Sequence, residues 1–236
     1  MKKGLFTLLI IAFASTISFA QFKYGADLYS RYIWRGSDIG NSPSFQPSIT
    51  FTTGGLSVGF WGAYALASSA NNATTYAEDD FWASYTLSTE KAGSFSVIYT
   101  DYYIPSLGIP FGFYKPTSPG SAAHTLEGGV GYTGPDKFPI AINFYNNLSN
   151  DPDNSSYIQA AYPFTISETT LTLTAGMTPS KSAYYGTTGG NIINLGITVA
   201  KSIVITDKFS LPINVSYINN PAQDKSYLVF GASLTF

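Results

Sequence analysis

Few side chains in this 236-residue sequence could carry out acid–base or nucleophilic chemistry. His124 is the only histidine, and the chain has no His-x-Ser or Asp-x-His pairing of the kind expected in barrel hydrolases. Its position in an alternating strand pattern places it on an outward face at a rim. Asp79 and Asp80 are adjacent in an expected strand, where neighbours point to opposite faces, so they do not form a carboxylate pair. We therefore predict that the chain is not an enzyme.

Metal and cofactor chemistry has equally little support. The sequence contains no cysteine, which excludes disulfides, thiolate catalysis and cysteine-ligated metals. Residues 150–154, NDPDN, could offer oxygen ligands to a hard cation, although this composition is also typical of a turn. We predict no cofactor and no metal site. The formal net charge is −2 and no basic cluster exists, so we also predict no nucleic-acid partner.

Five charged residues are the best candidates for a functional cluster. They are Arg31 and Arg35 within SRYIWRG, Glu78, Asp80 and Glu127. All five fall on the same face of their expected strands, toward the same end. Opposite charges in a confined space of low dielectric constant tend to pair, and such arrays can also set ion selectivity. A structural network that closes a narrow barrel and a selectivity role remain equally open.

The N-terminus has the layout of a secretory signal peptide. Two lysines precede an uncharged apolar run at about residues 5–14, and small residues precede Gln21. The alternative, a membrane anchor, needs about 20 apolar residues, twice the length of this run. We predict cleavage after Ala20, so that residues 1–20 are the signal peptide and residues 21–236 form one domain.

Beyond that segment, apolar residues recur with a period of two from end to end, which indicates strands. Residues 209–217, for example, alternate between Phe, Leu, Ile, Val and Tyr on one face and Ser, Pro, Asn and Ser on the other. Most of these segments are about 10 to 12 residues long, enough for a tilted strand to cross a bilayer. We expect twelve strands, beginning near residues 22, 44, 56, 77, 94, 124, 138, 155, 170, 191, 209 and 225.

The connections between these strands alternate between short and long. This rhythm is typical of outer-membrane barrels, which have tight periplasmic turns and longer external loops. A soluble sandwich is the alternative, but its polar face would be charged, whereas charged residues make up only 11% of this chain and aromatic residues 16%. The sequence therefore predicts an all-β protein: a single antiparallel transmembrane barrel in the bacterial outer membrane, with lipid as a partner.

Both ends of the barrel sequence can then be oriented. On a first strand that starts near Phe22, Tyr32 and Trp34 should face lipid while the two arginines face the lumen. The last expected strand, residues 225–236, ends GxxLxF. This pattern, made by Gly231, Leu234 and Phe236, matches the signal by which the barrel assembly machinery recognises its clients, so that machinery is a predicted partner during biogenesis.

One stretch carries a family resemblance. DLYSRYIWRGSDIGNSPSFQPSITF, residues 27–51, resembles the N-terminal signature of a TorF-type family of bacterial outer-membrane proteins described as porins. The match covers about 25 residues; elsewhere only length, signal peptide and strand rhythm agree. The resemblance implies an outer-membrane barrel that forms a channel, and it supplies no substrate or catalytic residue.

These observations favour a passive, porin-like channel for small hydrophilic solutes or ions. A non-conducting structural or surface-interaction barrel is the second interpretation, and a barrel enzyme is the third.

Overall fold

The structure is a computed structural model that describes residues 20–68, 75–118 and 120–235. The expected signal peptide, apart from Ala20, and Phe236 of the expected assembly signal lie outside the described residues. The strand β1 begins at Gln21, the residue after the predicted cleavage site.

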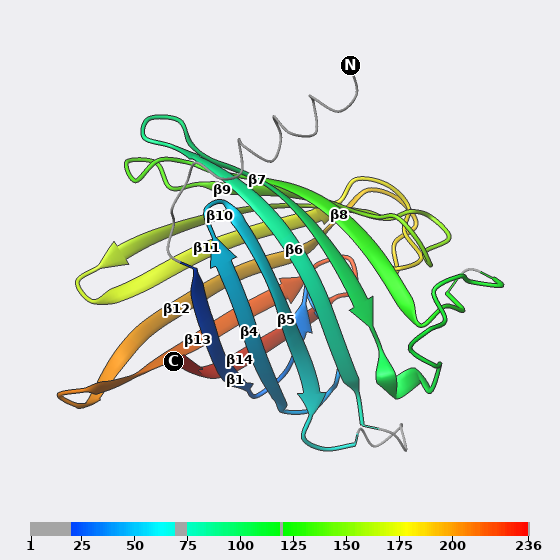
Figure 1. The fold of residues 1–236 in the computed structure, drawn as a ribbon, viewed down its shortest axis with the longest axis horizontal. Coiled ribbons are helices and arrows are strands. Elements are labelled where there is room, and N and C mark those ends of the chain that lie inside the picture. Colours follow the sequence, from blue (N-terminus) through cyan, green and yellow to red (C-terminus); the bar gives the residue numbers. More distant parts are fainter. Residues whose placement is uncertain (1–19, 69–74, 119, 236) are drawn as a thin grey trace.

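Twelve antiparallel strands close into a barrel, which confirms the predicted fold class (Figure 1). Each pairs with its neighbours in sequence order, and β1 pairs with both β4 and β14 to close the wall. The wall strands are β1 (Gln21–Tyr29), β4 (Ser44–Thr53), β5 (Leu56–Ala65), β6 (Ala77–Thr89), β7 (Gly93–Tyr103), β8 (His124–Thr133), β9 (Ala141–Asn147), β10 (Ser156–Ile166), β11 (Thr169–Thr178), β12 (Asn191–Thr206), β13 (Phe209–Asn220) and β14 (Lys225–Thr235). The only described helix is the three-residue 3₁₀ turn η1 (Pro105–Leu107), so no helix in the described part of the chain is long enough to cross a membrane.

The alternation of side chains separates an apolar outer surface from a polar inner one. On β12 and β13, Val199 pairs with Val215, and both are more than a third exposed. The next pair, Thr198 and Ser216, joins its hydroxyl groups across the lumenal face at 2.8 Å. Because side chains point to opposite faces in turn, this pattern fixes which half of every strand faces the lumen.

The strand starts follow the expected positions closely except at β9. This strand begins at Ala141 rather than near residue 138. Pro139 cannot donate a backbone hydrogen bond to a neighbouring strand, and the Phe138 N–H instead donates to the Pro135 carbonyl in a turn at 2.8 Å. The short connections lie at one end of the barrel and the long ones at the other, although the last of the expected long loops, residues 221–224, is only four residues.

Two glycines allow the close approach of β1 and β14 at the seam, and a Cβ atom at the first, Gly25, would collide with the Leu234 carbonyl oxygen. Tyr29 pairs with Gly231, and a Cβ atom at this glycine would collide with the Tyr29 ring. Gly231, expected to belong to the assembly signal, therefore gives the Tyr29 side chain its place in the lumen. Leu234 of the same expected signal pairs with Ala26 across the seam.

The stretch SRYIWRG leaves the wall instead of extending the first strand. After Ser30, whose N–H still bonds to the Phe230 carbonyl at 2.8 Å, the chain turns inward. It forms a two-stranded hairpin from β2 (Ile33–Trp34) and β3 (Ser37–Asp38). We call residues 30–43 the lumenal hairpin.

The expectation that Tyr32 and Trp34 face lipid is therefore wrong. Tyr32 is only 7% exposed and packs against Trp61 and Tyr76, with ring centroids 5.4 and 6.3 Å away. The cause is the turn between β2 and β3, where Arg35 and Gly36 have φ values of 49° and 81°. Two successive residues with positive φ make a tight hairpin turn and cannot continue a wall strand.

Candidate functional site

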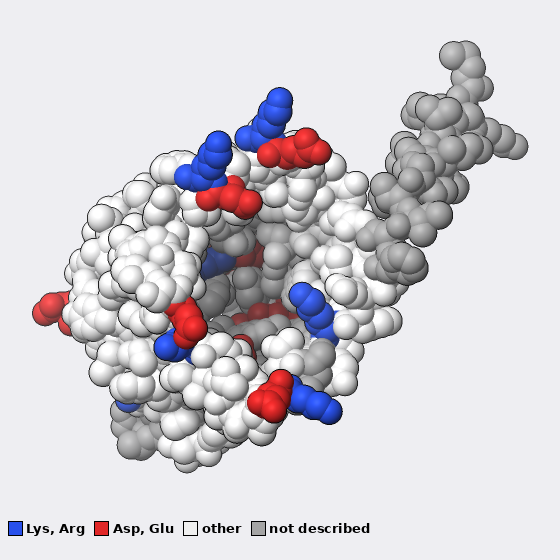
Figure 2. Space-filling view, turned by 90° about the vertical axis from the view of Figure 1, so that its left-hand side faces the viewer, with Lys and Arg blue, Asp and Glu red and all other residues white. Residues whose placement is uncertain are grey.

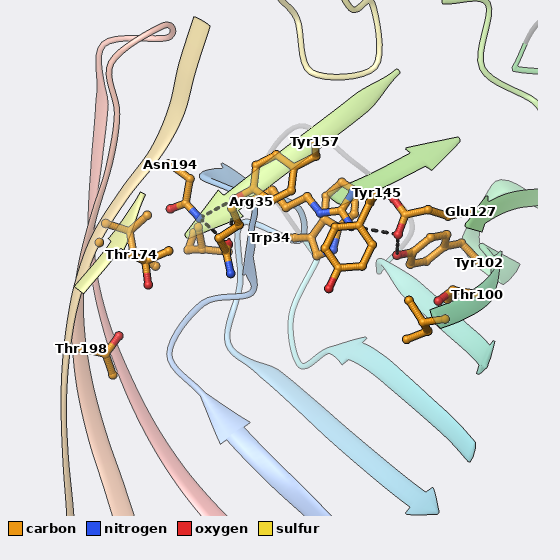
Figure 3. Close-up of a pocket in the computed structure, with 15 residues that line it drawn as sticks. Trp34, Arg35, Thr100, Tyr102, Glu127, Tyr145, Tyr157, Thr174, Asn194 and Thr198 are labelled. Carbon is orange, nitrogen blue, oxygen red and sulfur yellow. Dashed lines mark hydrogen bonds and ion pairs between the residues drawn. The ribbon is translucent and has the colours of Figure 1, made fainter. Parts of the chain in front are cut away.

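The tip of the lumenal hairpin is joined to the wall by a buried ion pair. Arg35 Nη1 and Nη2 donate to Glu127 Oε2 and Oε1 of β8 at 2.6 and 2.9 Å (Figure 3). Tyr102 of β7 donates to the same carboxylate at 2.9 Å, and Arg35 Nη1 also donates to the Tyr185 hydroxyl oxygen at 2.6 Å. The side chains of Arg35 and Glu127 are 8% and 2% exposed. Two parallel hydrogen bonds between opposite charges give this contact both strength and a fixed direction.

Aromatic rings surround the same guanidinium. Its central carbon lies 4.3 Å from the Trp34 ring centroid, 4.5 Å from Tyr145 and 4.7 Å from Tyr157. Trp34 in turn stacks on Tyr185 with centroids 5.9 Å apart. Cation–π contacts strengthen when water is excluded, so the rings hold the charge in place while covering it.

Close backbone packing sets the depth of the hairpin. A Cβ atom at Gly36 would collide with the carbonyl oxygen of Ile193 on β12, so only glycine fits at this contact. Ile193 is the extra residue of a bulge, since Met177 of β11 pairs with Ile192 and Gly176 pairs with Asn194. Asn220 Nδ2 donates to the Gly36 carbonyl at 3.1 Å. The hairpin tip is therefore attached to opposite sides of the wall.

The other predicted site residues form separate groups. Arg31 bonds to Asp38 and to Asn41, both within the lumenal hairpin, and none of its ion pairs in the described residues reaches β6 or β8. Its side chain is 40% exposed. The structure thus brings together Arg35 and Glu127 but gives Arg31 a local partner that the sequence analysis missed.

Glu78 and Asp80 lie on the lumenal face of β6 without a cation. Both are buried, and Tyr76 donates its hydroxyl to Glu78 Oε2 at 2.8 Å. Asp80 Oδ1 has no hydrogen-bond partner among the described residues, and no described ion pair includes either carboxylate. The five residues expected to form one network therefore fall into three groups. These are the ion pair of Arg35 with Glu127, the pair of Arg31 with Asp38 inside the lumenal hairpin, and the two acidic residues on β6.

Open space adjoins the ion pair and the lumenal hairpin. Seen from the end with the short turns, the wall surrounds a deep hollow with charged side chains at its base (Figure 2). A cavity of about 430 Å³ adjoins Trp34 and Arg35, and we call it the main cavity. A second cavity of about 410 Å³ shares Ile33, Thr198 and Ile218 with it. A smaller space of about 140 Å³ also borders Trp34 and is lined by Glu78 and Tyr185. Trp34 therefore stands between the main cavity and this smaller space.

His124 has a structural setting outside the lumen. It pairs with Tyr103 at the start of β8 and is completely buried beneath the connection of residues 104–123. Its Nε2 lies 2.5 Å from the Phe111 carbonyl oxygen, and its Nδ1 lies 2.7 Å from Asp101 Oδ1. The Tyr114 ring stacks on the imidazole at 3.8 Å. A carbonyl oxygen only accepts, so Nε2 donates, and the histidine fastens the loop to the wall.

The acidic run at residues 150–154 is satisfied by protein donors. The Asp151 carboxylate accepts from the Ser155 N–H at 2.8 Å and from Asn147 Nδ2 at 2.9 Å. Asp153 accepts from the Ala183 N–H at 2.7 Å and from Lys181 at 3.3 Å, and these donors lower the pKa of Asp153. Across the described ranges, no three His, Asp or Glu side chains gather in a way that could hold a metal ion.

Comparisons with known proteins place few limits on this site. No family model matches the sequence, and no curated protein matches it. Among solved structures, the barrel is similar to a mutant of the Rh. blastica porin at 10% identity and a TM-score of 0.37, over 92% of this chain and all of that one. Similarity at this level identifies no function for this chain.

Proposed function

We propose that the protein is a bacterial outer-membrane barrel that acts as a passive, porin-like channel for small hydrophilic solutes or ions. The observation that carries this proposal is a closed wall around two adjoining cavities of about 430 and 410 Å³. Their linings include threonine, serine, asparagine and glutamine side chains, which can replace the hydrogen bonds that a small solute makes with water.

The outer surface supports the membrane location. Large apolar side chains point away from the lumen on successive strands and are well exposed, such as Phe22, Leu173 and Phe230. A belt of this extent is unfavourable in water and favourable in lipid. Insertion by the barrel assembly machinery and contact with outer-membrane lipid follow as parts of the same proposal.

A non-conducting structural barrel is the second candidate, and the lumenal hairpin favours it. The ion pair of Arg35 with Glu127 holds this segment across the lumen, where it narrows any path. A channel with this obstruction should show a small conductance, whereas a structural barrel should show none.

Conductance of the purified full-length protein in planar lipid bilayers separates these two candidates. Discrete current steps that scale with protein concentration would support the channel. A correctly folded barrel, identified by a change in gel mobility on boiling, that never conducts would favour the structural candidate. Recovery of the protein as a soluble periplasmic monomer would contradict both.

A further inference from the structure

We infer that the main cavity binds an uncharged, polyhydroxylated solute of about monosaccharide size. The inference deepens the proposed channel function and rests on it, because the solute would reach the cavity through the lumen. At about 430 Å³, the cavity is within the range of roughly 300 to 1,000 Å³ that is common for small-molecule sites.

The lining carries no uncompensated charge. Arg35 and Glu127 are its two ionisable groups of opposite sign, and they neutralise each other through two hydrogen bonds. Tyr102 donates to the same carboxylate, Arg35 also donates to the Tyr185 hydroxyl oxygen, and three aromatic rings lie against the guanidinium. An ion entering the main cavity would lose water without gaining an opposite charge, whereas the smaller desolvation cost of a neutral solute can be offset by hydrogen bonds to the lining.

One side of the cavity offers a hydrogen-bond donor and an acceptor next to each other, the amide groups of Gln159 and Asn194. Tyr157 donates to Gln159 Oε1 at 2.8 Å, and Asn194 Nδ2 donates to the Tyr157 oxygen at 3.0 Å. These bonds fix both amides, yet no bond among the described residues uses Gln159 Nε2 or Asn194 Oδ1. Thr174 adds a hydroxyl group to the same side. A vicinal pair of hydroxyls on a solute can accept from one amide and donate to the other.

The opposite side of the cavity carries aromatic rings. Trp34 and Tyr145 lie there, with the Arg35 guanidinium against both rings, and Figure 3 shows the two rings across from Asn194 and Thr174. Cyclic polyols have faces of C–H groups that pack on aromatic rings, while their hydroxyl groups project at the edge. Apolar rings on one side and fixed amides on the other match this division.

Gly196 offers a clean way to fill the cavity. It lines the main cavity on β12, and a Cβ atom there would be 3.5 Å from the Thr174 Cβ, an ordinary contact. Gly196→Ser should therefore fold and leave most of the space open. Gly196→Val should also fold, since β-branched residues suit strands, but its two methyl groups enter the cavity. Neither change touches the ion pair or the lumenal hairpin.

The test is a titration of Trp fluorescence in the refolded full-length protein with glucose, and with gluconate as a charged solute of similar size. We expect a saturable change with glucose, at least tenfold weaker affinity for gluconate, an affinity loss of at least tenfold in Gly196→Val, and a change below about threefold in Gly196→Ser. The signal should disappear in Trp34→Phe, which keeps a ring at the site.

Three results would overturn the inference: no saturable response to glucose, equal affinity for gluconate, or unchanged affinity in Gly196→Val. Swelling of liposomes in glucose and bilayer conductance keep this test separate from that of the channel. Ion conductance without glucose binding would contradict the binding site but support the channel. Glucose binding without any flux would contradict the channel but support the binding site.

Discussion

Replacing Arg35 with glutamine should lower the free energy of unfolding by about 3 to 5 kcal/mol, the usual cost of breaking a buried ion pair from one side. The reason is that Glu127, with its side chain 2% exposed, would keep just one of its hydrogen bonds to the described residues, the one from Tyr102. Glu127→Gln should cost a similar amount, because it leaves the cation among three rings without its counter-charge.

The double variant, Arg35→Gln with Glu127→Gln, separates the interaction energy of the ion pair from the cost of losing each side chain alone. With both groups replaced by glutamine, two neutral amides face each other and no charge is left buried at this contact. The loss should then be smaller than the sum of the single losses by at least about 2 kcal/mol. Unfolding by guanidinium in detergent, followed by Trp fluorescence, measures each corner of this cycle.

Arg31→Gln is the matched control, since it makes the same chemical change in the same hairpin. Arg31 is 40% exposed and pairs within the hairpin, so its loss should cost about 0 to 1 kcal/mol. Arg35→Gln should also increase bilayer conductance, because the hairpin loses its hold on β8, while Arg31→Gln should not. Equal stability and equal conductance for the two variants would contradict the conclusion that the Arg35–Glu127 ion pair holds the lumenal hairpin against β8.

Three further changes test other parts of the barrel. Asp80→Asn should raise the free energy of unfolding by about 1 kcal/mol, because it removes one of two acidic groups that lie buried together on β6 without a cation among the described ion pairs; a loss of stability would show that the charge is compensated. Gly36→Ala should loosen the lumenal hairpin and increase proteolysis within residues 30–43, whereas unchanged protection would contradict the close contact at Ile193. Because the pKa of Asp153 is lowered, its contribution is present above the unfolded pKa of about 3.9 and disappears as the pH falls through the lower folded value. The protection factor of the Ala183 amide, which corrects for the slower intrinsic exchange in acid, should therefore fall only at acidic pH in the parent and should already be lower at pH 7 in Asp153→Asn; identical protection in both would rule out this anchor.

The wall could be predicted from the sequence because its signal is local. Alternation within each segment identifies a strand and its two faces, and Thr198 and Val199 show the same division in the structure. The lumenal hairpin could not be predicted in this way. Tyr32 and Trp34 continue the alternation of β1, and an apolar ring has the same pattern whether it faces lipid or a packed lumen. Contacts with residues far away in the sequence, such as that of Tyr32 with Trp61, decide that these rings face the lumen.

The candidate site could be predicted only in part, because alternation within a strand shows which face a side chain is on but not which distant residue it contacts. Strand parity placed Arg35 and Glu127 on one side of the wall, and they are in contact. Strand parity gives no distances between side chains. The sequence analysis therefore grouped Arg31 with acidic residues of β6 and β8 that Arg31 does not contact. Tyr185 belongs to a connection rather than a strand, where no periodicity marks the direction of a side chain.

The attachment points of the lumenal hairpin also constrain the order of folding. Arg35 meets Glu127 across 92 residues of chain, and Gly36 meets Asn220 across 184. Contacts of such long sequence separation form slowly, because the intervening chain must first be ordered. The hairpin is synthesised directly after the first strand, yet its binding surface exists only when β8, β12 and β13 stand in the wall. Its docking is therefore a late step, and it stabilises only a barrel whose strands are already in register.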